Sequence, residues 1–337
     1  MLKQNKVELY WLILSCCSLV ILIIVGGLTR LTDSGLSITN WQIFSGIIPP
    51  LSNNEWIKYF NLYKQIPEFK QLNFDMSLGQ FKIIFWWEYA HRILARLTVV
   101  IFFIPFIILL IKKKINKKKI LLSFIVSTLF FIQGFFGWYM VKSGLINNVD
   151  VSHFRLSLHL ITALIIYSLI FWLLLNCEND LIKFRFNLVN YGLIILLFMS
   201  YVQIIFGAFV SGLDAGLIYQ TWPLMNENFI AEEIQIKFIA SYSSLSEHAY
   251  VQFYHRMLAY FLILIFLYIY IKNINLKALN ILYLNIILIA IIFQVILGIL
   301  TLVSGLNIIL ASLHQIGSIL LISSILLALY KLNVKIN

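Results

Sequence analysis

Four histidines of the sequence lie inside long apolar stretches: His91, His159, His255 and His314. An ionisable side chain in a membrane helix is costly and usually faces the protein interior with a partner. Each of these histidines lies about six to ten residues from one end of its stretch, which places all four at a depth of about 9–15 Å. Two pairs at one depth, His91 with His159 and His255 with His314, predict two sites that bind haem iron from both faces.

Two other interpretations of these histidines were weighed against haem ligation. Each histidine could be a packed core residue with hydrogen bonds, but this does not explain four histidines at one depth. A site for iron or zinc without porphyrin usually needs three or four ligands, with carboxylates or thiolates among them. Each pair offers two imidazoles, and Glu88 is the carboxylate at matching depth. His153 and His248 lie at the outer membrane edge without a repeated partner, and we interpret both as interfacial.

One residue distinguishes the two predicted sites. The first contains Glu88-x-x-His91 and the second contains Gln252-x-x-His255. At this spacing both side chains share one helix face, so each polar side chain lies beside a proposed iron ligand. A carboxylate in apolar surroundings can exchange protons near neutral pH, and an amide cannot. The first site is therefore predicted to perform chemistry and the second to hold a cofactor. The alternative for Glu88 is an ion pair with Arg92.

Two arginines follow iron-ligand candidates directly, Arg92 after His91 and Arg256 after His255. The forked donors of arginine suit carboxylates, so both arginines are candidates for contacts to haem propionates. Each could equally be a boundary arginine that extends its charged end to the membrane surface.

The elements that position these residues must be membrane helices. The chain has 337 residues, of which 61% are hydrophobic and 12% charged, and its mean hydropathy is +0.92. A water-soluble domain needs more charge on its surface, and a membrane helix needs about 20 apolar residues. The sequence predicts an all-α integral membrane protein with eight spans, at 9–29, 81–111, 120–142, 153–175, 188–210, 249–271, 277–303 and 307–330.

The net charge of +11 is a signal of membrane topology, and we expect no nucleic-acid partner. Six lysines lie between residues 112 and 119, in one short connection, and further pairs of basic residues follow the fourth, sixth and eighth spans. Cytoplasmic connections carry such an excess of basic residues, so both termini are predicted to be cytoplasmic. The later basic pairs are Lys183 with Arg185, Lys272 with Lys277 and Lys331 with Lys335.

The two halves of the chain repeat each other. Residues 26–41 align with 207–222, and residues 88–97 align with 252–261. Further on, Gln133…Gly137 matches Gln294…Gly298, and the Ser-Leu-His before position 160 matches the Ser-Leu-His that ends at 314. Both halves run in the same direction, so the repeat is parallel. The sequence therefore predicts two four-helix bundles, residues 1–180 with one site and residues 181–337 with the other.

These motifs carry a resemblance to a known family. They are the stretch GGLTRLTDSGLSITNWQIFSGIIPPL, the E-x-x-H-R from Glu88 to Arg92, VSHFRLSLHL around His159, VQFYHR around His255 and SLHQ around His314. In this combination and order, over nearly the whole chain, they resemble haem A synthase. The motif E-x-x-H-R is specific only together with the others.

The resemblance implies an oxidoreductase that oxidises the C8 methyl group of haem O to a formyl group, which gives the haem A used by cytochrome oxidase. It implies successive hydroxylations to a geminal diol that loses water. It places the substrate haem between His91 and His159, and a b-type haem cofactor between His255 and His314. It also assigns the essential acid to Glu88, which the difference between the repeats had singled out independently.

The resemblance also leads to expectations about branch, location and partners. Some members carry a cysteine pair in the first outer segment, but this chain has no cysteine in residues 30–80, which is similar to the loop-cysteine-free branch of some bacteria and of mitochondria. We expect a bacterial inner membrane, with the sites toward the periplasm. Haem O synthase is the expected source of substrate, and the electron donor and a homo-oligomer are left open.

Two rival functions explain part of the pattern. A dihaem b-type electron-transfer cytochrome explains the four histidines, but it gives no reason for the unequal Glu88 and Gln252. A transporter explains the parallel repeat, but it predicts broken helices near the midplane in both halves. Pro105 has no counterpart in the second half.

Overall fold

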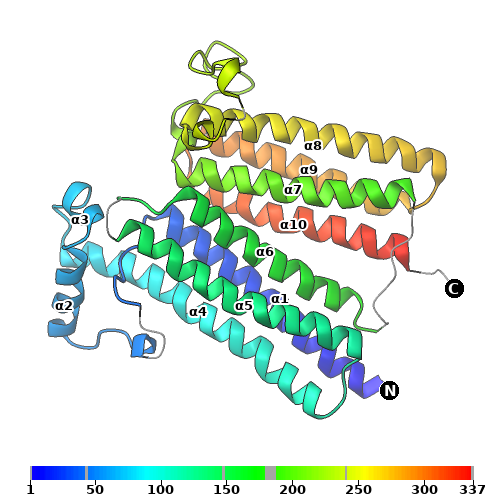
Figure 1. Ribbon diagram of the computed structural model, residues 1–337, viewed down its shortest axis with the longest axis horizontal. Helices are drawn as coiled ribbons and strands as arrows, with labels where there is room; N and C mark the ends of the chain where they lie inside the picture. The colour runs from blue at the N-terminus through cyan, green and yellow to red at the C-terminus, as the bar shows by residue number, and fades with distance from the viewer. Residues whose placement is uncertain (1, 42–44, 146–148, 179–186, 240, 335–337) are drawn as a thin grey trace.

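The computed structural model describes residues 2–41, 45–145, 149–178, 187–239 and 241–334, and these residues form an all-helical protein (Figure 1). Eight of its helices are long and apolar enough to cross a membrane, which confirms the predicted number of spans. They are α1 (Leu2–Leu31), α4 (Leu78–Ile111), α5 (Lys117–Gly144), α6 (His153–Leu175), α7 (Leu188–Gly212), α8 (His248–Leu276), α9 (Ile281–Val303) and α10 (Ile308–Asn333).

One predicted boundary, the start of the seventh span at residue 277, falls in the turn that precedes α9. Lys277 has a φ of 47° and ends α8 in the left-handed conformation. The side chain of Asn273 accepts a hydrogen bond from Leu279 N at 2.8 Å and donates one to Leu279 O at 2.8 Å, which fixes a turn. Asn280 then caps α9, which begins at Ile281. The stretch between the two helices, residues 272–280, contains two lysines and three asparagines, and these polar residues are the sequence signal for the turn.

The eight long helices lie in two groups that correspond to the two halves of the sequence (Figure 1). In the first half α1 packs on α4 and α6, and α5 packs on α6; in the second half α7 packs on α8 and α10, and α9 packs on α10. The halves meet through α1, α6, α7 and α10. Both termini lie at one end of the molecule, opposite the short helices α2 (Asn53–Tyr63) and α3 (Pro67–Gln71).

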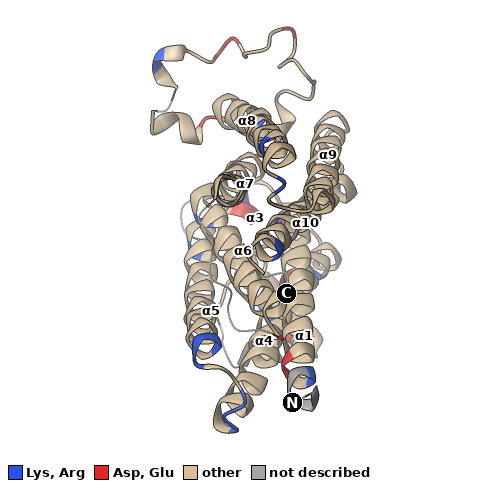
Figure 2. Cartoon of the chain, turned by 90° about the vertical axis from the view of Figure 1, so that its right-hand side faces the viewer, with Lys and Arg blue, Asp and Glu red and all other residues tan. Residues whose placement is uncertain are grey.

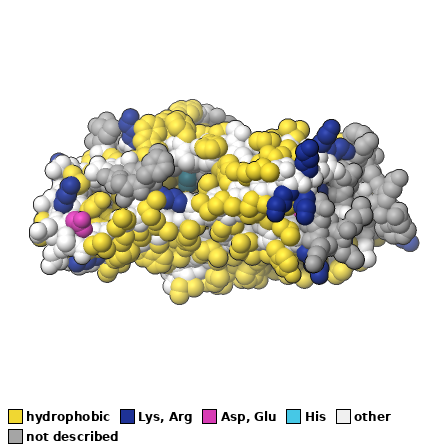
Figure 3. Space-filling model, turned by 90° about the horizontal axis from the view of Figure 1, so that it is seen from below, with side chains coloured by type: hydrophobic (Ala, Val, Ile, Leu, Met, Phe, Trp, Pro, Cys, Tyr) yellow, Lys and Arg dark blue, Asp and Glu magenta, His cyan; other side chains and the backbone are white. Residues whose placement is uncertain are grey.

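The outer surface of the helices is apolar over most of its length. Large hydrophobic side chains on all eight long helices face outward, and one face of the molecule shows a broad hydrophobic area with Lys and Arg toward both ends (Figure 3). An apolar surface of this extent marks a membrane region. Basic residues also gather at the turn between α4 and α5 (Figure 2). Lys183, Arg185 and Lys335, which contribute to the predicted topology, lie outside the described residues.

A buried ion pair joins three elements at the end that holds the termini. Lys119 Nζ lies 2.8 Å from Glu8 Oε1 and donates to Cys177 O at 2.9 Å. Both charged side chains are almost fully buried, at 6% and 8% exposure. Removing one partner from such a pair leaves an uncompensated buried charge, so this contact fixes the relative positions of α1, α5 and the end of α6.

The outer segments are more structured than the sequence analysis expected, since no helix was predicted between residues 30 and 80. Ser52 and Glu55 form a capping box at the start of α2. This S-x-x-E pattern is the signal that would have found the helix. Trp56 and Phe60 are buried against Phe81 and Phe85 of α4, so α2 holds the preceding segment against the outer end of α4. Four short 3₁₀ helices complete the described segments: Ser45–Ile47, Ala215–Leu217, Ile236–Phe238 and Ser243–Ser246.

A buried acid in α3 makes the stability of this outer segment depend on pH. Glu68 is 5% exposed, and its burial raises the pKa of the carboxyl from 4.5 to about 8, against the opposing effect of a hydrogen bond with Tyr63. The unfolded chain releases this proton near pH 4.5 while the folded chain holds it up to about pH 8. The favourable contribution is therefore full below the unfolded value and is lost as pH rises through this window.

We expect Glu68→Gln to make the α2–α3 segment more stable than in the wild type at pH 8, because glutamine has no proton to lose, and equally stable at pH 4. The ratio of amide hydrogen-exchange rates in wild type and variant at each pH measures this difference, since intrinsic exchange cancels in the ratio. A ratio that is constant from pH 4 to pH 8 would contradict the prediction.

Candidate functional site

The four histidines predicted as iron ligands come from α4, α6, α8 and α10, and the structure brings the rings of the second pair close together at nearly a right angle. The ring centroids of His255 and His314 are 6.5 Å apart, with an interplanar angle of 84°. A metal–imidazole bond of about 2 Å places each ring centre about 3 Å from the metal. The separation of the two rings therefore fits one metal ion bound between them.

Each of the four imidazoles packs against a glycine of the preceding long helix. A Cβ atom at these glycines would lie only 2.8 to 3.2 Å from the Cε1 atom of the histidine. A larger residue would thus push the ring away from its position. The repeat in the sequence included these glycines, but their role in making room for imidazoles becomes visible only in the structure. The pairs are Gly26 with His91, Gly137 with His159, Gly207 with His255 and Gly298 with His314.

Three imidazoles have a buried ring nitrogen, Nδ1, without a hydrogen-bond partner among the described residues: His91, His159 and His314. A buried polar atom without a partner is unfavourable, and metal ligation is one way to satisfy an imidazole. The fourth imidazole, His255, has a neighbour at this atom: Gln203 Nε2 lies 3.1 Å from His255 Nδ1 and donates to His255 O at 2.9 Å. In the first half Gln133 donates to His159 O at 3.0 Å. These glutamines help to hold the ligand helices in place.

No group of three or more His, Cys, Asp or Glu side chains suited to a metal ion occurs within the described part of the chain. Two imidazoles per site are too few for a metal centre built from protein ligands alone. A haem supplies the four remaining donors itself. The paired rings of His255 and His314, the buried Nδ1 atoms without a partner and the glycines beside the imidazoles therefore fit a haem held by two histidines.

The Glu88 carboxylate is held by donors on both oxygens. Oε2 accepts hydrogen bonds from Ser37 Oγ and from Ile38 N, both at 2.7 Å. Oε1 accepts from Arg92 Nε at 3.1 Å and Nη2 at 2.5 Å. Glu88 is 3% exposed. Four donors around a buried carboxylate stabilise its ionised form and fix its direction beside His91. The ion pair with Arg92, weighed as an alternative from the sequence, is present.

Ser37 is a site residue that the sequence analysis missed. It is 1% exposed and lies in the segment directly after α1, in the repeated stretch 26–41. The signal that could have found it is the repeat itself, because the matching residue in the second half is Ile218. A hydroxyl is thus present beside Glu88, and an aliphatic side chain occupies the matching position in the half that has Gln252.

The second half has a similar arrangement, with the neutral Gln252 in place of the charged Glu88. Gln252 Nε2 donates to Tyr219 O at 2.9 Å, and Arg256 donates to Tyr219 O and to Leu224 O, both at 3.0 Å. Ile38 and Tyr219 are matching positions of the repeat. In both halves the E/Q-x-x-H-R motif therefore binds the segment that follows the preceding long helix. Only the first half places a carboxylate there.

Comparison with known proteins agrees with this geometry. The family model described as cytochrome oxidase assembly protein (COX15-CtaA) matches residues 9–326. The heme A synthase of Pelagibacter ubique (strain HTCC1062) is 48% identical over 321 residues, which cover 95% of each chain. The chain belongs to the haem A synthase family. The heme A synthase of Rickettsia felis is 43% identical over 330 residues, covering 96% of this chain and 97% of the relative. That of Rickettsia bellii (strain OSU 85-389) is 45% identical over 322 residues, covering 94% and 95%.

Within this haem A synthase fold, Arg92 has its donors engaged by the protein. Besides Glu88, it donates to Ile38 O at 2.9 Å and to Asn40 O at 3.4 Å, and its guanidinium lies 5.1 Å from the ring centre of Trp41. Arg92 also lines a small cavity of about 20 Å³, together with Arg96. A cavity of this size holds about one water molecule.

The two halves of the haem A synthase chain are joined near this end by Arg30. It pairs with Asp33 at 2.8 Å and with Asp214 at 3.1 Å, and it donates to Ser211 O at 2.7 Å. Asp33 and Asp214 are matching positions, and both have a φ near 50°. They are turn residues, and they also provide the carboxylates for a contact between the halves.

The two histidines left out of the predicted ligand set each begin a long helix. His153 begins α6 and is buried against Gly212 of α7, and its Nε2 lies 3.0 Å from Leu245 O. It therefore helps to pack α6 against α7 at their outer ends. His248 begins α8 and is seven residues from His255.

Proposed function

We propose that this haem A synthase, which converts haem O to haem A, divides the work between its two halves. Residues 1–180 form the bundle that receives haem O, and residues 181–337 form the bundle that holds haem b. The observation that carries this assignment is the unequal pair Glu88 and Gln252 in otherwise matching surroundings. A carboxylate can take part in proton transfer or stabilise positive charge during oxidation, and an amide can do neither at neutral pH.

In this proposal His91 and His159 bind the iron of haem O, and His255 and His314 bind the iron of haem b. The separation of the second pair of rings and the glycine beside each ring support axial ligation. Haem b supplies electron transfer when it is bound. The protein residues set the position of each haem by fixing the imidazole rings between helices.

Glu88 acts in this proposal as a fixed carboxylate near the methyl group of haem O that is oxidised. It lies one turn from His91, and Ser37, Ile38 N and Arg92 hold it in one orientation. Since all four contacts are donors, the geometry favours stabilisation of positive charge over proton relay. A proton relay would need the carboxylate to exchange one of these contacts during each turnover.

The arginines beside the ligands have a secondary role in this proposal. Arg92 and Arg256 hold the segments that close over the two sites, and they remain the candidates for contact to the haem propionates. Arg96 lines the same small cavity as Arg92, so it is a further candidate for this contact. In both halves a propionate would have to share arginine donors with backbone carbonyls.

The proposal includes a membrane arrangement. Two parallel four-helix bundles span a bacterial inner membrane with both termini in the cytoplasm and the haem sites toward the periplasm. The basic α4–α5 turn, at the end that holds the termini, supports this orientation. We place the chain in the branch without loop cysteines, and we propose that haem O synthase supplies the substrate while a separate donor supplies electrons.

Haem extracted from membranes that contain this chain together with a haem O synthase tests the proposed function. We expect haem A, identified by its mass, in addition to haem B. The dihaem electron-transfer alternative predicts unmodified haem B and haem O from a folded, haem-loaded protein. That result would reject the proposed reaction.

A further inference from the structure

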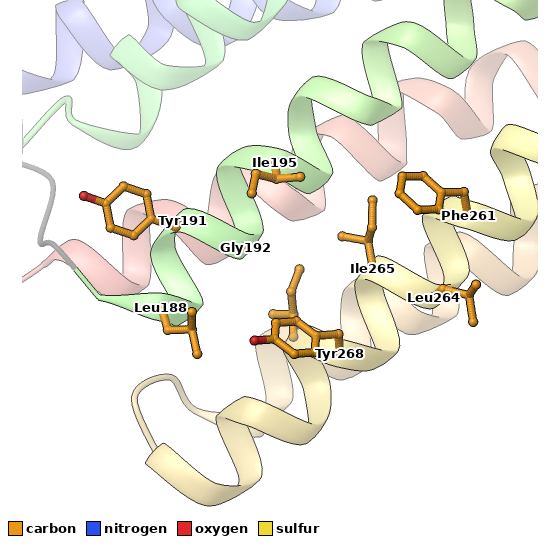
Figure 4. A pocket seen from close by; sticks show the side chains of 9 residues that line it. Leu188, Tyr191, Gly192, Ile195, Phe261, Leu264, Ile265 and Tyr268 are labelled. Carbon is orange, nitrogen blue, oxygen red and sulfur yellow. The ribbon is translucent and has the colours of Figure 1, made fainter.

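An apolar groove opens between α7 and α8, near the end of the molecule that holds both termini (Figure 4). Its volume is about 330 Å³. Leu188 and Ile195 lie on the α7 wall, and Phe261 and Leu264 lie on the α8 wall. These four side chains are 45% to 63% exposed, so the groove opens outward to the surface that faces the bilayer.

The repeat shows a difference between the two halves at the groove. In the register that aligns residues 26–41 with 207–222, Gly192 of the groove matches Trp11. The Trp11 indole is buried between α1 and α4, where it donates to Phe102 O at 3.0 Å and stacks on Phe106 with ring centres 6.1 Å apart. Gly192 has no side chain, and a Cβ there would lie 2.7 Å from Ile269. The side-chain direction at Gly192 is therefore occupied by Ile269 of α8, and the groove opens beside these two residues.

The length of the groove fits within the thickness of one leaflet of a bilayer. From Leu188 to Ile195 the α7 wall extends about 10 Å along the helix axis. Half of a bilayer's hydrocarbon region is about 15 Å thick. A single acyl chain from the leaflet at this end can therefore cover the groove along its whole length.

Positive charge lies at the end of the groove. Tyr268 lines the groove, and Lys272 Nζ lies 5.5 Å from the centre of its ring. From His248 to the end of the chain the sequence contains no Asp or Glu, while Lys272, Lys277 and Lys331 all lie near this end of the helices. Lysines at a membrane surface attract anionic headgroups.

We infer that the groove between α7 and α8 is a binding site for an anionic phospholipid. One acyl chain lies along the apolar walls beside Gly192, and the phosphate contacts Lys272 at the membrane surface. This site is separate from the haem sites, so the proposal does not depend on the proposed division of the two haems.

The full chain, purified with its haems, provides the test. The protein is depleted of lipid and then loaded with phosphatidylglycerol or with phosphatidylcholine of the same acyl chains, and retained lipid is counted by native mass spectrometry. We expect one retained phosphatidylglycerol per chain and weaker retention of phosphatidylcholine. Ile195→Trp fills the groove and is expected to reduce this retention at least tenfold. Leu14→Trp, at the matching position of α1, is the control and is expected to leave retention unchanged.

The headgroup contact has its own pair of variants. Lys272→Gln is expected to weaken retention of phosphatidylglycerol about fivefold, the effect of one lysine near an anionic headgroup, and to leave phosphatidylcholine unchanged. Lys331→Gln is the control, because Lys331 Nζ also lies near a tyrosine ring, 5.7 Å from that of Tyr330, but on α10. Equal effects of both lysines, or no effect of Ile195→Trp, would overturn the proposal. The proposal would also be overturned if Ile195→Trp abolished a dimer, because a helix of a second copy would then occupy the groove. It would likewise be overturned if this variant lost bound haem O, because the substrate would then be the occupant.

Discussion

Glu88→Gln is expected to reduce haem A formation at least about a hundredfold, the lower range for loss of a positioned acid–base group, while the content of haem b stays unchanged. Glutamine keeps the size of the side chain, so the fold and the histidine ligands remain. It removes the negative charge that Arg92, Ser37 and Ile38 N hold beside His91. The measurement is the amount of haem A relative to haem B in extracts of membranes with equal amounts of protein.

Two variants control this experiment. Glu68→Gln removes another buried glutamate from the same half, on α3 and not on a helix with a proposed iron ligand, and should keep haem A formation. Ser37→Ala keeps the carboxylate but removes one donor, and we expect a loss of about tenfold, the effect of a hydrogen bond to a charged group. Haem A formation at the wild-type rate in Glu88→Gln would show that the carboxylate is dispensable.

His314→Ala is expected to remove the resident haem b, with haem affinity lowered by more than about a hundredfold. Loss of a residue that hydrogen-bonds to a metal ligand already lowers metal affinity roughly 10–100-fold, and loss of the ligand itself is expected to lower it further. His255 would be left as one imidazole in an apolar bundle. The absorption spectrum of the purified protein and its haem content per chain measure the loss.

The matched control is His159→Ala, at the equivalent position of the first half. If the division of labour is right, this variant keeps haem b and loses the conversion of haem O. The two variants should therefore differ in haem content although both lose activity. Equal haem loss in both would contradict the assignment of substrate and cofactor to separate halves.

Much of the fold could be predicted from hydrophobicity, because runs of about 20 apolar residues cross a bilayer wherever they occur. The span at 153–175 agrees with α6 at both ends. The predicted start at residue 277 falls in a turn fixed by Asn273 side-chain hydrogen bonds, and the lysines and asparagines at 272–280 are its signal in the sequence. Helices α2 and α3 escaped notice because they are short; the signal for α2 is its capping box, and α3 begins at Pro67 without a side-chain cap.

The candidate site was predictable where the repeat kept or changed a chemical group. The four histidines and Glu88 were found in this way. Ser37 was not, because a serine after a helix is common and its distance to Glu88 spans 51 residues of sequence. The glycines beside the imidazoles were seen as repeated letters, but the reason for them is a three-dimensional contact.

Arg30 carries a consequence for how such a chain could arise. Its matching position is Ser211, and Arg30 donates to the backbone oxygen of that same residue while it pairs with the matching aspartates Asp33 and Asp214. In a dimer of two identical chains both positions would be arginine, and two guanidinium groups would compete for one place on the symmetry axis. Gene fusion removes this conflict, since each copy can then mutate separately. The Arg30 contact between the two halves is therefore one that a symmetric homodimeric ancestor could not have formed.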